Sequence, residues 1–453
     1  MSPPRYDSKD ASAKALGEPL KFHVSGRSAP NRFLKGAMTE RLSSWDPKNF
    51  EKRGIPSDNL INAYRRWGEG QIGLILTGNL MIDYDQLEAM GNPIIPRTDD
   101  SFSESSERFS QFKKMAEVSK AHGSLVVGQV SHPGRQCENR IQPNPVSASD
   151  VQLEGDVMGM HFNKPHAATQ EEIDRIVDGF AHAAEYLHKA GYDGIELHGA
   201  HGYLLAQFLS ETTNQRTDKY GGSLENRSRI IIEMAQEIRK RVPKGFILGI
   251  KLNSVEFQAK GFQPEEAKEL CQILERSEFD FVELSGGTYE SLAFEHKRES
   301  TKARESFFLD FAEQITAGLK KGGLATYITG GFKSVGAMVG ALQTVDGVGL
   351  ARPLTQEPRL CRDILDGKVT GAIKQHFDDS NFGLTNVVAG TQIRQLGKDQ
   401  EPLDGSSDKV VEGFMKDMGV WSEGMSQDKN LEKFGYIDLE NVPSAPYGTA
   451  AAS

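Results

Sequence analysis

The sequence has few cysteines, no excess of positive charge and no long apolar run, and each shortage argues against a class of protein. Its 453 residues include three cysteines, Cys137, Cys271 and Cys361, which lie far apart and form no C-x-x-C pair. This pattern suggests neither a disulfide framework nor an iron–sulfur or zinc site, and it fits a reducing compartment. The net charge of -10 argues against a nucleic-acid partner, which would need a basic face.

No stretch of the sequence is long and apolar enough to span a bilayer, and the first ten residues, MSPPRYDSKD, lack the apolar run of a secretory signal. We therefore expect a cytoplasmic protein that makes no membrane contact. Hydrophobic residues make up 38% of the chain, which is enough for the sizeable core of a globular protein.

Short apolar runs recur between longer segments that carry helix signals, such as the capping-box pattern of Thr169 and Glu172 and the helix stop at Gly191. Because the runs are continuously apolar rather than alternating, they predict strands buried on both faces, as in a parallel sheet. The eight runs are Arg32–Thr39, Gly73–Thr77, Ser124–Val130, Gly194–His198, Phe246–Leu252, Phe279–Leu284, Ala325–Thr329 and Gly347–Ala351.

Eight alternations of strand and helix predict an α/β fold of the (β/α)₈ TIM-barrel type, with a doubly wound open sheet as the alternative. The barrel is favoured because polar residues follow many different strands, and in a barrel all these strand ends share one rim. We expect a polar N-terminal arm at residues 1–19, the barrel at 20–370, and a helical and irregular C-terminal extension with a loose tail at 371–453.

His198, His201 and Tyr203 follow the fourth run directly. The two histidines fit a structural role, a metal site as in barrel hydrolases, or a pair of donors that hold and polarise a carbonyl oxygen. No third or fourth ligand has metal-site spacing, and we expect Glu196 to point away from His198 or to lie on the other strand face. Tyr203 favours the third interpretation, because a phenol beside two imidazoles can donate a proton.

Thr329 ends the seventh run, Gly330 and Gly331 follow it, and Arg352 follows the eighth run. A tight turn and a surface ion pair would explain these residues without any ligand. Their paired positions favour a phosphate site instead, built from glycine N–H groups and a guanidinium at the usual place in this fold. The pattern therefore predicts a cofactor or substrate that carries a phosphate.

Gln129 and Lys251 lie inside otherwise apolar runs, where an amide or an ammonium is costly unless it has a partner. Gln129 has both donor and acceptor capacity and suits the polar edge of a ligand ring, and Lys251 would supply positive charge to an anionic ligand. A buried salt bridge between Lys251 and Glu283 is the alternative.

The charged segment Glu295–Glu305 fits a solvated loop. If this loop folds over the rim, Lys297, Arg298 or Arg304 could meet the phosphates of a nicotinamide cofactor. Arg298 and Lys302 are only weak hints of the extra phosphate of NADPH.

Several of these segments together resemble the Old Yellow Enzyme family of flavin oxidoreductases. The run from Asp193 to Arg229 is similar to the family signature nearly residue for residue, and its part NQRTDKYGGSLENR is the most specific. The resemblance extends over NRFLKGAMTE, QVSHPGR, ITGGF and LARPLTQEP, and it covers roughly Leu20 to Leu365.

The resemblance implies FMN across the C-terminal rim of the barrel. It implies that Thr39 bonds flavin O4, that Gly78 leaves room beside the ring, and that Gln129 binds the pyrimidine edge. Lys251 would then lie near N1 and O2. The phosphate end would comprise Gly330, Gly331, Ala351 and Arg352.

The resemblance also implies an NADPH- or NADH-dependent ene-reductase acting on small α,β-unsaturated carbonyl compounds. NAD(P)H would give hydride to flavin N5, which would pass it to the substrate β-carbon. His198 and His201 would bind the carbonyl oxygen, and Tyr203 would protonate the α-carbon. A homodimer is one assembly that the C-terminal extension allows.

Two positions depart from the family pattern. Lys251 stands where the better-known branches usually have arginine, so the charge is kept but the planar fork is lost. Thr39 accompanies the histidine pair, where many members with two histidines have cysteine. Alternatives on the same fold are a flavin oxidase, a demethylase, or a quinone or nitro reductase. A metal-dependent hydrolase that uses His198 and His201 is the alternative from another class.

Overall fold

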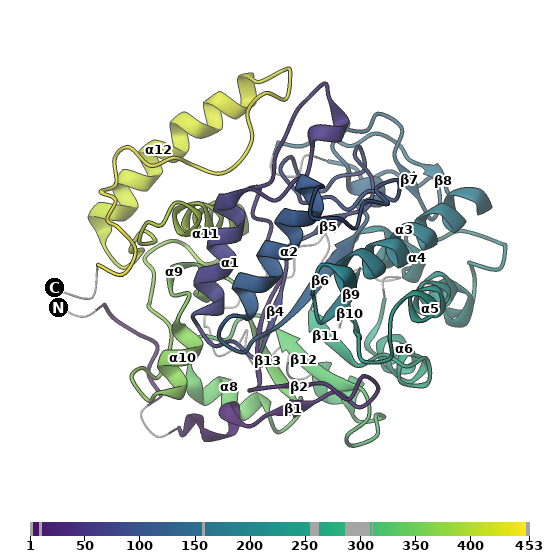
Figure 1. Cartoon of the computed structure of the whole chain (residues 1–453), viewed down its shortest axis with the longest axis horizontal. Coiled ribbons are helices and arrows are strands. Elements are labelled where there is room, and N and C mark those ends of the chain that lie inside the picture. The colour runs from purple at the N-terminus through teal and green to yellow at the C-terminus, as the bar shows by residue number, and fades with distance from the viewer. Residues whose placement is uncertain are drawn as a thin grey trace.

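The computed structural model describes residues 3–8, 11–155, 159–253, 262–285, 309 and 311–449. Within them, eight parallel strands form a closed barrel surrounded by helices (Figure 1), which confirms the predicted (β/α)₈ fold. The pairing of the second barrel strand with the third closes the ring. In chain order the barrel strands are β3 (Phe33–Lys35), β4 (Leu74–Leu76), β6 (Leu125–Ser131), β9 (Gly194–Gly199), β10 (Ile247–Asn253), β11 (Phe281–Ser285), β12 (Ala325–Thr329) and β13 (Gly347–Leu350).

Each predicted strand overlaps one barrel strand, and Ala325–Thr329 matches β12 at both ends. The first differs most, because Arg32–Thr39 contributes only the three residues of β3. After Lys35 the chain leaves the sheet and forms part of the rim. The remaining short strands are β1 (Leu20–Lys21), β2 (Ser28–Ala29), β5 (Leu80–Met81), β7 (Val146–Ser147) and β8 (His166–Ala167).

Helices cover the outside of the barrel (Figure 1). The predicted capping box is present at α3, where the Thr169 and Glu172 side chains each accept a hydrogen bond from the other residue's backbone N–H, and this helix ends two residues before Gly191. The α-helices with bounds in the structure are α1 (Asp58–Gly68), α2 (Glu107–Lys120), α3 (Gln170–Lys189), α4 (Leu204–Leu209), α5 (Leu224–Arg241), α6 (Pro264–Arg276), α8 (Val335–Ala341), α9 (Pro353–Gln356), α10 (Leu360–Leu365), α11 (Phe382–Gly397) and α12 (Asp408–Gln427). Three short 3₁₀ helices are η1 (Ala13–Gly17), η2 (Phe50–Lys52) and η3 (Gly134–Gln136).

The barrel interior changes from apolar to polar along the strands. Its lower part is filled by side chains such as Leu74, Phe281 and Tyr327, and the β1–β2 hairpin adds Phe22 to the same cluster. Side chains that point outward from the strands pack against the helices in the main hydrophobic core. Toward the carboxyl ends of the strands, the inward-facing positions hold polar side chains. Polar groups at this rim are available for ligand binding or catalysis.

The region after residue 370 contains the two long helices α11 and α12 (Figure 1). Helix α11 packs against α1 and α9, and α12 packs through Phe414 on a separate apolar cluster that includes Phe377 and Ile437. The N-terminal arm joins the same region, since Tyr6 N donates to Ala372 O at 3.0 Å. The boundaries at residues 19 and 370 stay a prediction.

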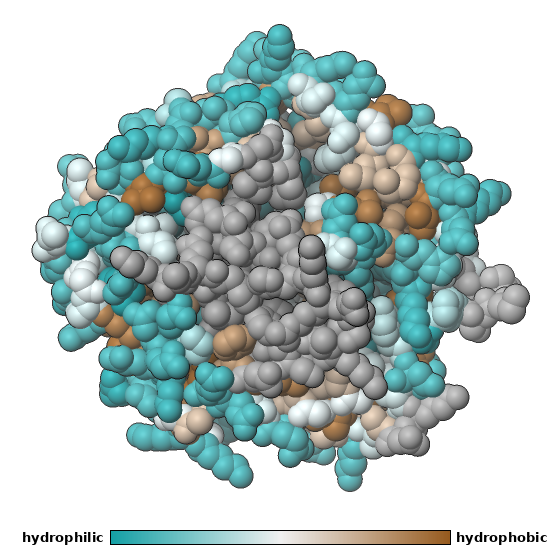
Figure 2. All heavy atoms as spheres, turned by 180° about the vertical axis from the view of Figure 1, so that it is seen from behind, coloured by the Kyte–Doolittle hydropathy of each residue, from teal (hydrophilic) through white to brown (hydrophobic). Residues whose placement is uncertain are grey.

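No helix in the described ranges is long and apolar enough to cross a membrane. On the face shown in Figure 2, the coloured surface is mostly hydrophilic and its hydrophobic side chains lie in small groups. The segment Glu295–Glu305, with Lys297, Arg298, Lys302 and Arg304, lies outside the described residues.

Candidate active site

A cavity of about 270 Å³ lies at the carboxyl ends of the barrel strands. It is lined by every residue that the sequence predicted for the site except Gly78. The lining therefore includes Thr39, Gln129, His198, His201, Tyr203, Lys251, Gly330, Gly331, Ala351 and Arg352. Residues from distant strand regions thus meet at one rim, as the barrel prediction requires.

Gly78 lies behind the cavity wall. Its backbone N–H donates to Glu40 Oε1 and lies 2.9 Å from both this atom and Tyr64 Oη. A Cβ atom at Gly78 would collide with the Glu40 carboxylate and with Met38 O. A side chain at this position would thus meet Glu40 and Met38. The implied role of Gly78 beside a flavin ring stays a prediction.

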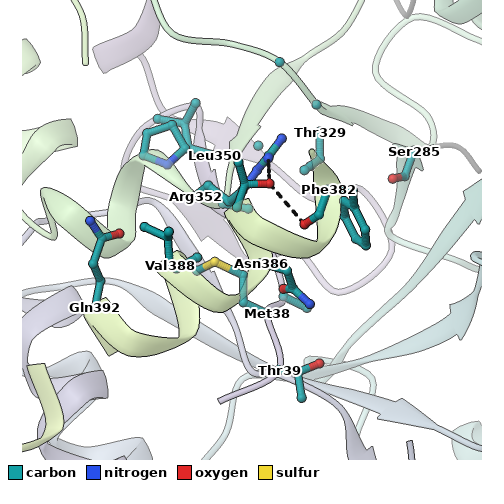
Figure 3. A pocket seen from close by; sticks show the side chains of 18 of the residues that line it. Met38, Thr39, Ser285, Thr329, Leu350, Arg352, Phe382, Asn386, Val388 and Gln392 are labelled. Atoms are coloured by element: carbon teal, nitrogen blue, oxygen red, sulfur yellow. Dashed lines mark hydrogen bonds between the residues drawn. The ribbon is translucent and has the colours of Figure 1, made fainter. Parts of the chain in front are cut away.

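Thr329, Gly330, Gly331 and Arg352, the residues predicted for a phosphate site, all line the cavity. Gly330 and Gly331 have φ values of 146° and 78°, a region that favours glycine. Arg352 Nη1 donates to Thr385 Oγ1 of α11 at 2.7 Å (Figure 3). The buried Thr329 hydroxyl has no hydrogen-bond partner among the described residues, so it can serve a ligand.

A layer of buried polar side chains lies beneath the cavity. Gln129 Nε2 donates to Glu196 Oε1 at 2.7 Å, and Lys251 Nζ lies 3.0 Å from Glu283 Oε1. The salt bridge considered for Lys251 is therefore present, although Lys251 also lines the cavity. Burial, followed by the nearby charge of Glu283, raises the pKa of Glu196 well above its ordinary value. Compared with an exposed carboxyl group, the neutral form of Glu196 is therefore favoured.

The expectation that Glu196 points away from His198 or lies on the other strand face is wrong. The two residues are two positions apart in β9, and side chains with that spacing share one face of a strand. Both face the barrel interior, where Glu196 meets Gln129 and His198 lines the cavity. Ile195 and Leu197 face outward and belong to the main hydrophobic core.

His198, His201 and Tyr203 form a compact group at the end of β9. His198 Nε2 lies 3.2 Å from His201 Nδ1, and the ring centres of His198 and Tyr203 are 4.7 Å apart. His201 adopts a left-handed backbone with φ of 59°, and its N–H donates to Asn253 Oδ1 at 3.1 Å. Such a conformation is uncommon outside glycine and costs free energy, so neighbouring contacts must hold it.

Both imidazoles are neutral at pH 7. Burial, followed by the charge of Lys251, lowers the pKa of His201 to about 3. Burial, followed by His201 and Lys251, holds the pKa of His198 well below its ordinary value. Each ring therefore carries one N–H and one lone pair, which suits hydrogen bonding to a polar ligand.

In the part of the chain that the structure describes, no group of three or more His, Cys, Asp or Glu side chains is arranged to hold a metal ion. These residues therefore provide no set of metal ligands around His198 and His201, which a metal-dependent hydrolase would need.

Sequence reasoning missed the wall that α11 contributes to the cavity. Phe382, Asn386, Val388 and Gln392 of this helix line it together with Met38 and Leu350 at the strand ends (Figure 3). Nothing in the pattern of α11 links it to the rim, because that contact depends on tertiary packing. Asn79 and Ser285 were also missed, although each follows a predicted strand by one or two residues, the spacing at which rim residues occur.

Known proteins resemble this chain in sequence and in fold. The model of the NADH:flavin oxidoreductase / NADH oxidase family matches residues 16–370. The NADH-dependent flavin oxidoreductase nadA of Aspergillus parasiticus is 52% identical over 92% of this chain and 94% of its own length. Among solved structures, morphinone reductase in complex with tetrahydroNAD has a TM-score of 0.63 at 23% identity, with 79% of this chain and 92% of that chain covered. The old yellow enzyme homologue from Zymomonas mobilis has a TM-score of 0.63 at 20% identity, with 82% and 98% covered. At these identities the two structures establish the fold.

Proposed function

Because this chain belongs to the NADH:flavin oxidoreductase / NADH oxidase family, the family of the Old Yellow Enzymes, we propose that it is an ene-reductase. It takes hydride from NADH and reduces the activated C=C bond of α,β-unsaturated carbonyl compounds. The observation that carries the proposal is the group of two neutral imidazoles and one phenol beside a cavity with an anion site at its far end. NADH is preferred over NADPH because the 52% identical relative is named as NADH-dependent.

The cavity fits FMN in three respects. Its phosphate would be held by Arg352 and the N–H groups of Gly330 and Gly331, with the partnerless Thr329 hydroxyl as a further donor. The apolar side chains between the two ends suit a flat ring system, and they include Ala37, Met38, Leu350 and Ala351.

At the other end of the cavity, the Gln129 amide and the Lys251 ammonium suit the pyrimidine edge of the ring, and Thr39 lines the same rim. Bound there, FMN would accept hydride from NADH and deliver it to the substrate.

His198 and His201 hold the carbonyl oxygen of the substrate. Their facing nitrogens, His198 Nε2 and His201 Nδ1, lie 3.2 Å apart and can both approach one oxygen atom. As hydride reaches the β-carbon, negative charge builds on this oxygen, and fixed donors in a buried site stabilise that charge. In the tautomers that carry a proton on these two nitrogens, the neutral imidazoles provide both donors.

Tyr203 supplies the proton that completes the reduction. Its side chain is 5% exposed and lines the cavity directly beside His198. A phenol in this position can donate its hydroxyl proton to the α-carbon while the imidazoles hold the oxygen. We therefore assign oxygen binding to the two histidines and proton donation to Tyr203.

An anaerobic titration of the purified, FMN-loaded protein tests the proposal. NADH should bleach the visible flavin absorption, and 2-cyclohexenone should restore it as the C=C bond is reduced. Restoration by oxygen, a quinone or a nitro compound but not by the enone would overturn the ene-reductase assignment and favour the oxidase or quinone and nitro reductase alternatives. A protein that stays colourless after incubation with FMN would overturn the cofactor assignment. The expected homodimer and cytoplasmic location stay predictions.

A further inference from the structure

Four side chains at the rim form one continuous line of hydrogen-bonding atoms. Asn79 Oδ1 lies 2.8 Å from His198 Nδ1, and His198 Nε2 lies 3.2 Å from His201 Nδ1. His201 Nε2 in turn lies 3.0 Å from Ser285 Oγ. All four line the cavity, and Ser131 Oγ lies 3.3 Å from His198 Nδ1 as a second neighbour of that atom.

The position of each proton along this line follows from its first member. A carbonyl oxygen of Asn79 facing His198 Nδ1 requires the proton on that nitrogen, so His198 Nε2 carries the lone pair. His201 then donates from Nδ1 to this lone pair, and its Nε2 accepts the hydroxyl proton of Ser285. Toward a ligand, the histidine pair therefore presents one acceptor and one donor.

Rotation of the Asn79 amide group by a half-turn would reverse the position of the proton on the His198 ring. The NH₂ group would then face His198 Nδ1, and the proton of His198 would move to Nε2. His201 would keep its proton on Nδ1, because Ser285 still donates to Nε2. The pair would then present two donors, which match the two lone pairs of a carbonyl oxygen, whereas one donor and one acceptor match a hydroxyl group.

We propose that Asn79 is a positioning residue that sets the tautomer of His198 and thereby selects between carbonyl and hydroxyl ligands at the histidine pair. The inference rests on the proposed function, since it assigns the ligand oxygen to His198 and His201. An amide suits the task because it carries a donor and an acceptor on one side chain without charge. Asn79 is only 5% exposed, so water cannot readily replace either group.

Two variants of Asn79 should act in opposite directions. Asn79→Asp offers only acceptor atoms and holds the proton on His198 Nδ1, so the pair keeps one donor and one acceptor. Asn79→Leu has a similar size and leaves the Ser131 hydroxyl, which can donate, as the neighbour of this nitrogen. The leucine variant therefore allows the two-donor state that a carbonyl needs. A role in packing alone would shift both variants in the same direction.

Binding of two ligands of equal shape to the FMN-loaded protein is the first test. Cyclohexanone accepts hydrogen bonds only, and cyclohexanol both donates and accepts. Asn79→Asp should bind cyclohexanone about tenfold more weakly, the equivalent of about one hydrogen bond, and should retain cyclohexanol. Asn79→Leu should retain cyclohexanone. Equal changes for the two ligands in both variants would overturn the proposal.

The tautomer itself can be followed by NMR of protein labelled with ¹⁵N-histidine, with the His198 signals assigned by their loss in His198→Asn. Without ligand, the proton should lie on Nδ1, and it should move to Nε2 when cyclohexanone binds. In Asn79→Asp it should stay on Nδ1, whereas Ser285→Ala, at the other end of the line, should leave the response of His198 intact. If the tautomer of His198 in the wild-type protein does not change when cyclohexanone binds, the proposal is wrong. Because neither ligand is turned over as an enone, these results stand apart from a failure of the ene-reductase assay.

Discussion

At the scale of single residues, Lys251 and Glu283 form a buried ion pair beneath the cavity. Glu196, whose pKa is raised mainly by burial, accepts from Gln129. The buried Lys35 also lies within electrostatic reach of Lys251 and Glu283. At position 251, lysine keeps a single positive charge, and the Glu283 carboxylate orients it.

Glu283→Gln should raise the midpoint potential of bound FMN. Without the carboxylate, the Lys251 charge is no longer compensated and favours the anionic reduced flavin. A rise of about 30 mV corresponds to about 1.4 kcal/mol for a two-electron couple, and we expect a change of at least this order. Spectroscopic redox titration measures it. Glu196→Gln is the matched control and should shift the potential less, because burial already favours the neutral form of Glu196. Equal shifts in both variants would argue against this balance of charges.

Tyr203→Phe should separate the two half-reactions. The variant keeps the ring that packs on His198 but loses the proton that we assign to the α-carbon. Reduction of 2-cyclohexenone should slow by about 10²- to 10⁴-fold, whereas reduction of FMN by NADH should stay within a few-fold of the wild-type rate. Stopped-flow absorption under nitrogen records both steps. Equal losses in the two half-reactions would remove Tyr203 from the role of proton donor.

At the scale of secondary-structure elements, helix α11 joins the anion site to the C-terminal part of the chain. Thr385 accepts a hydrogen bond from Arg352 and thereby fixes the guanidinium at the cavity. The same helix packs against α1, near the other end of the barrel sequence. The proposed phosphate site therefore depends on an element outside the eight strands and their connecting helices.

Thr385→Val should weaken FMN binding. Valine has nearly the same shape but cannot accept from Arg352, so the guanidinium loses part of its orientation; a lost hydrogen bond to a charged group corresponds to a roughly tenfold rise in Kd. Thr391→Val on the same helix is the matched control, since the Thr391 hydroxyl bonds to Val387 O. Fluorescence titration of the apoprotein with FMN measures both. Similar losses in the two variants would point to a general effect on the helix.

The same elements show which features of the fold and of the site can be predicted from the sequence. The eight strands were predictable because burial on both faces leaves uninterrupted apolar runs, and polar residues after those runs mark the rim. The contact between Gly78 and Glu40 was not predictable, because the two residues come from different parts of the chain. Helix α11 shows the limit for elements, because its contacts with α1 and the rim arise from packing between distant segments.

At the scale of the whole molecule, buried neutral histidines make the fold sensitive to acid. Burial is the main cause that lowers the pKa of His132, His182, His198 and His201. In the unfolded chain these groups titrate near pH 6.5, about the ordinary value. Between that pH and the lowered folded pKa, the unfolded state binds more protons, so stability falls as the pH falls.

His132→Asn should reduce this loss of stability in acid. Burial lowers the pKa of His132 to about 3, and its Nδ1 accepts from Gly134 N at 3.1 Å, a bond that an asparagine oxygen can replace. Well below pH 6.5 and above pH 3, the variant should lose up to about 1.4 kcal/mol less per pH unit than the wild type. Urea unfolding at pH 7 and pH 5 provides the comparison. Parallel losses in the two proteins would show that His132 gains no proton on unfolding.

The position of α11 also has a consequence for biosynthesis. The cavity wall begins at Ala37 and is completed by Gln392, which comes after every barrel strand. A ribosome makes the chain from its N-terminus, and domains fold as their residues emerge. A nascent barrel would therefore display an open rim until α11 had left the exit tunnel. Capture of the cofactor should be a late event, so the supply of free FMN matters once translation is nearly finished.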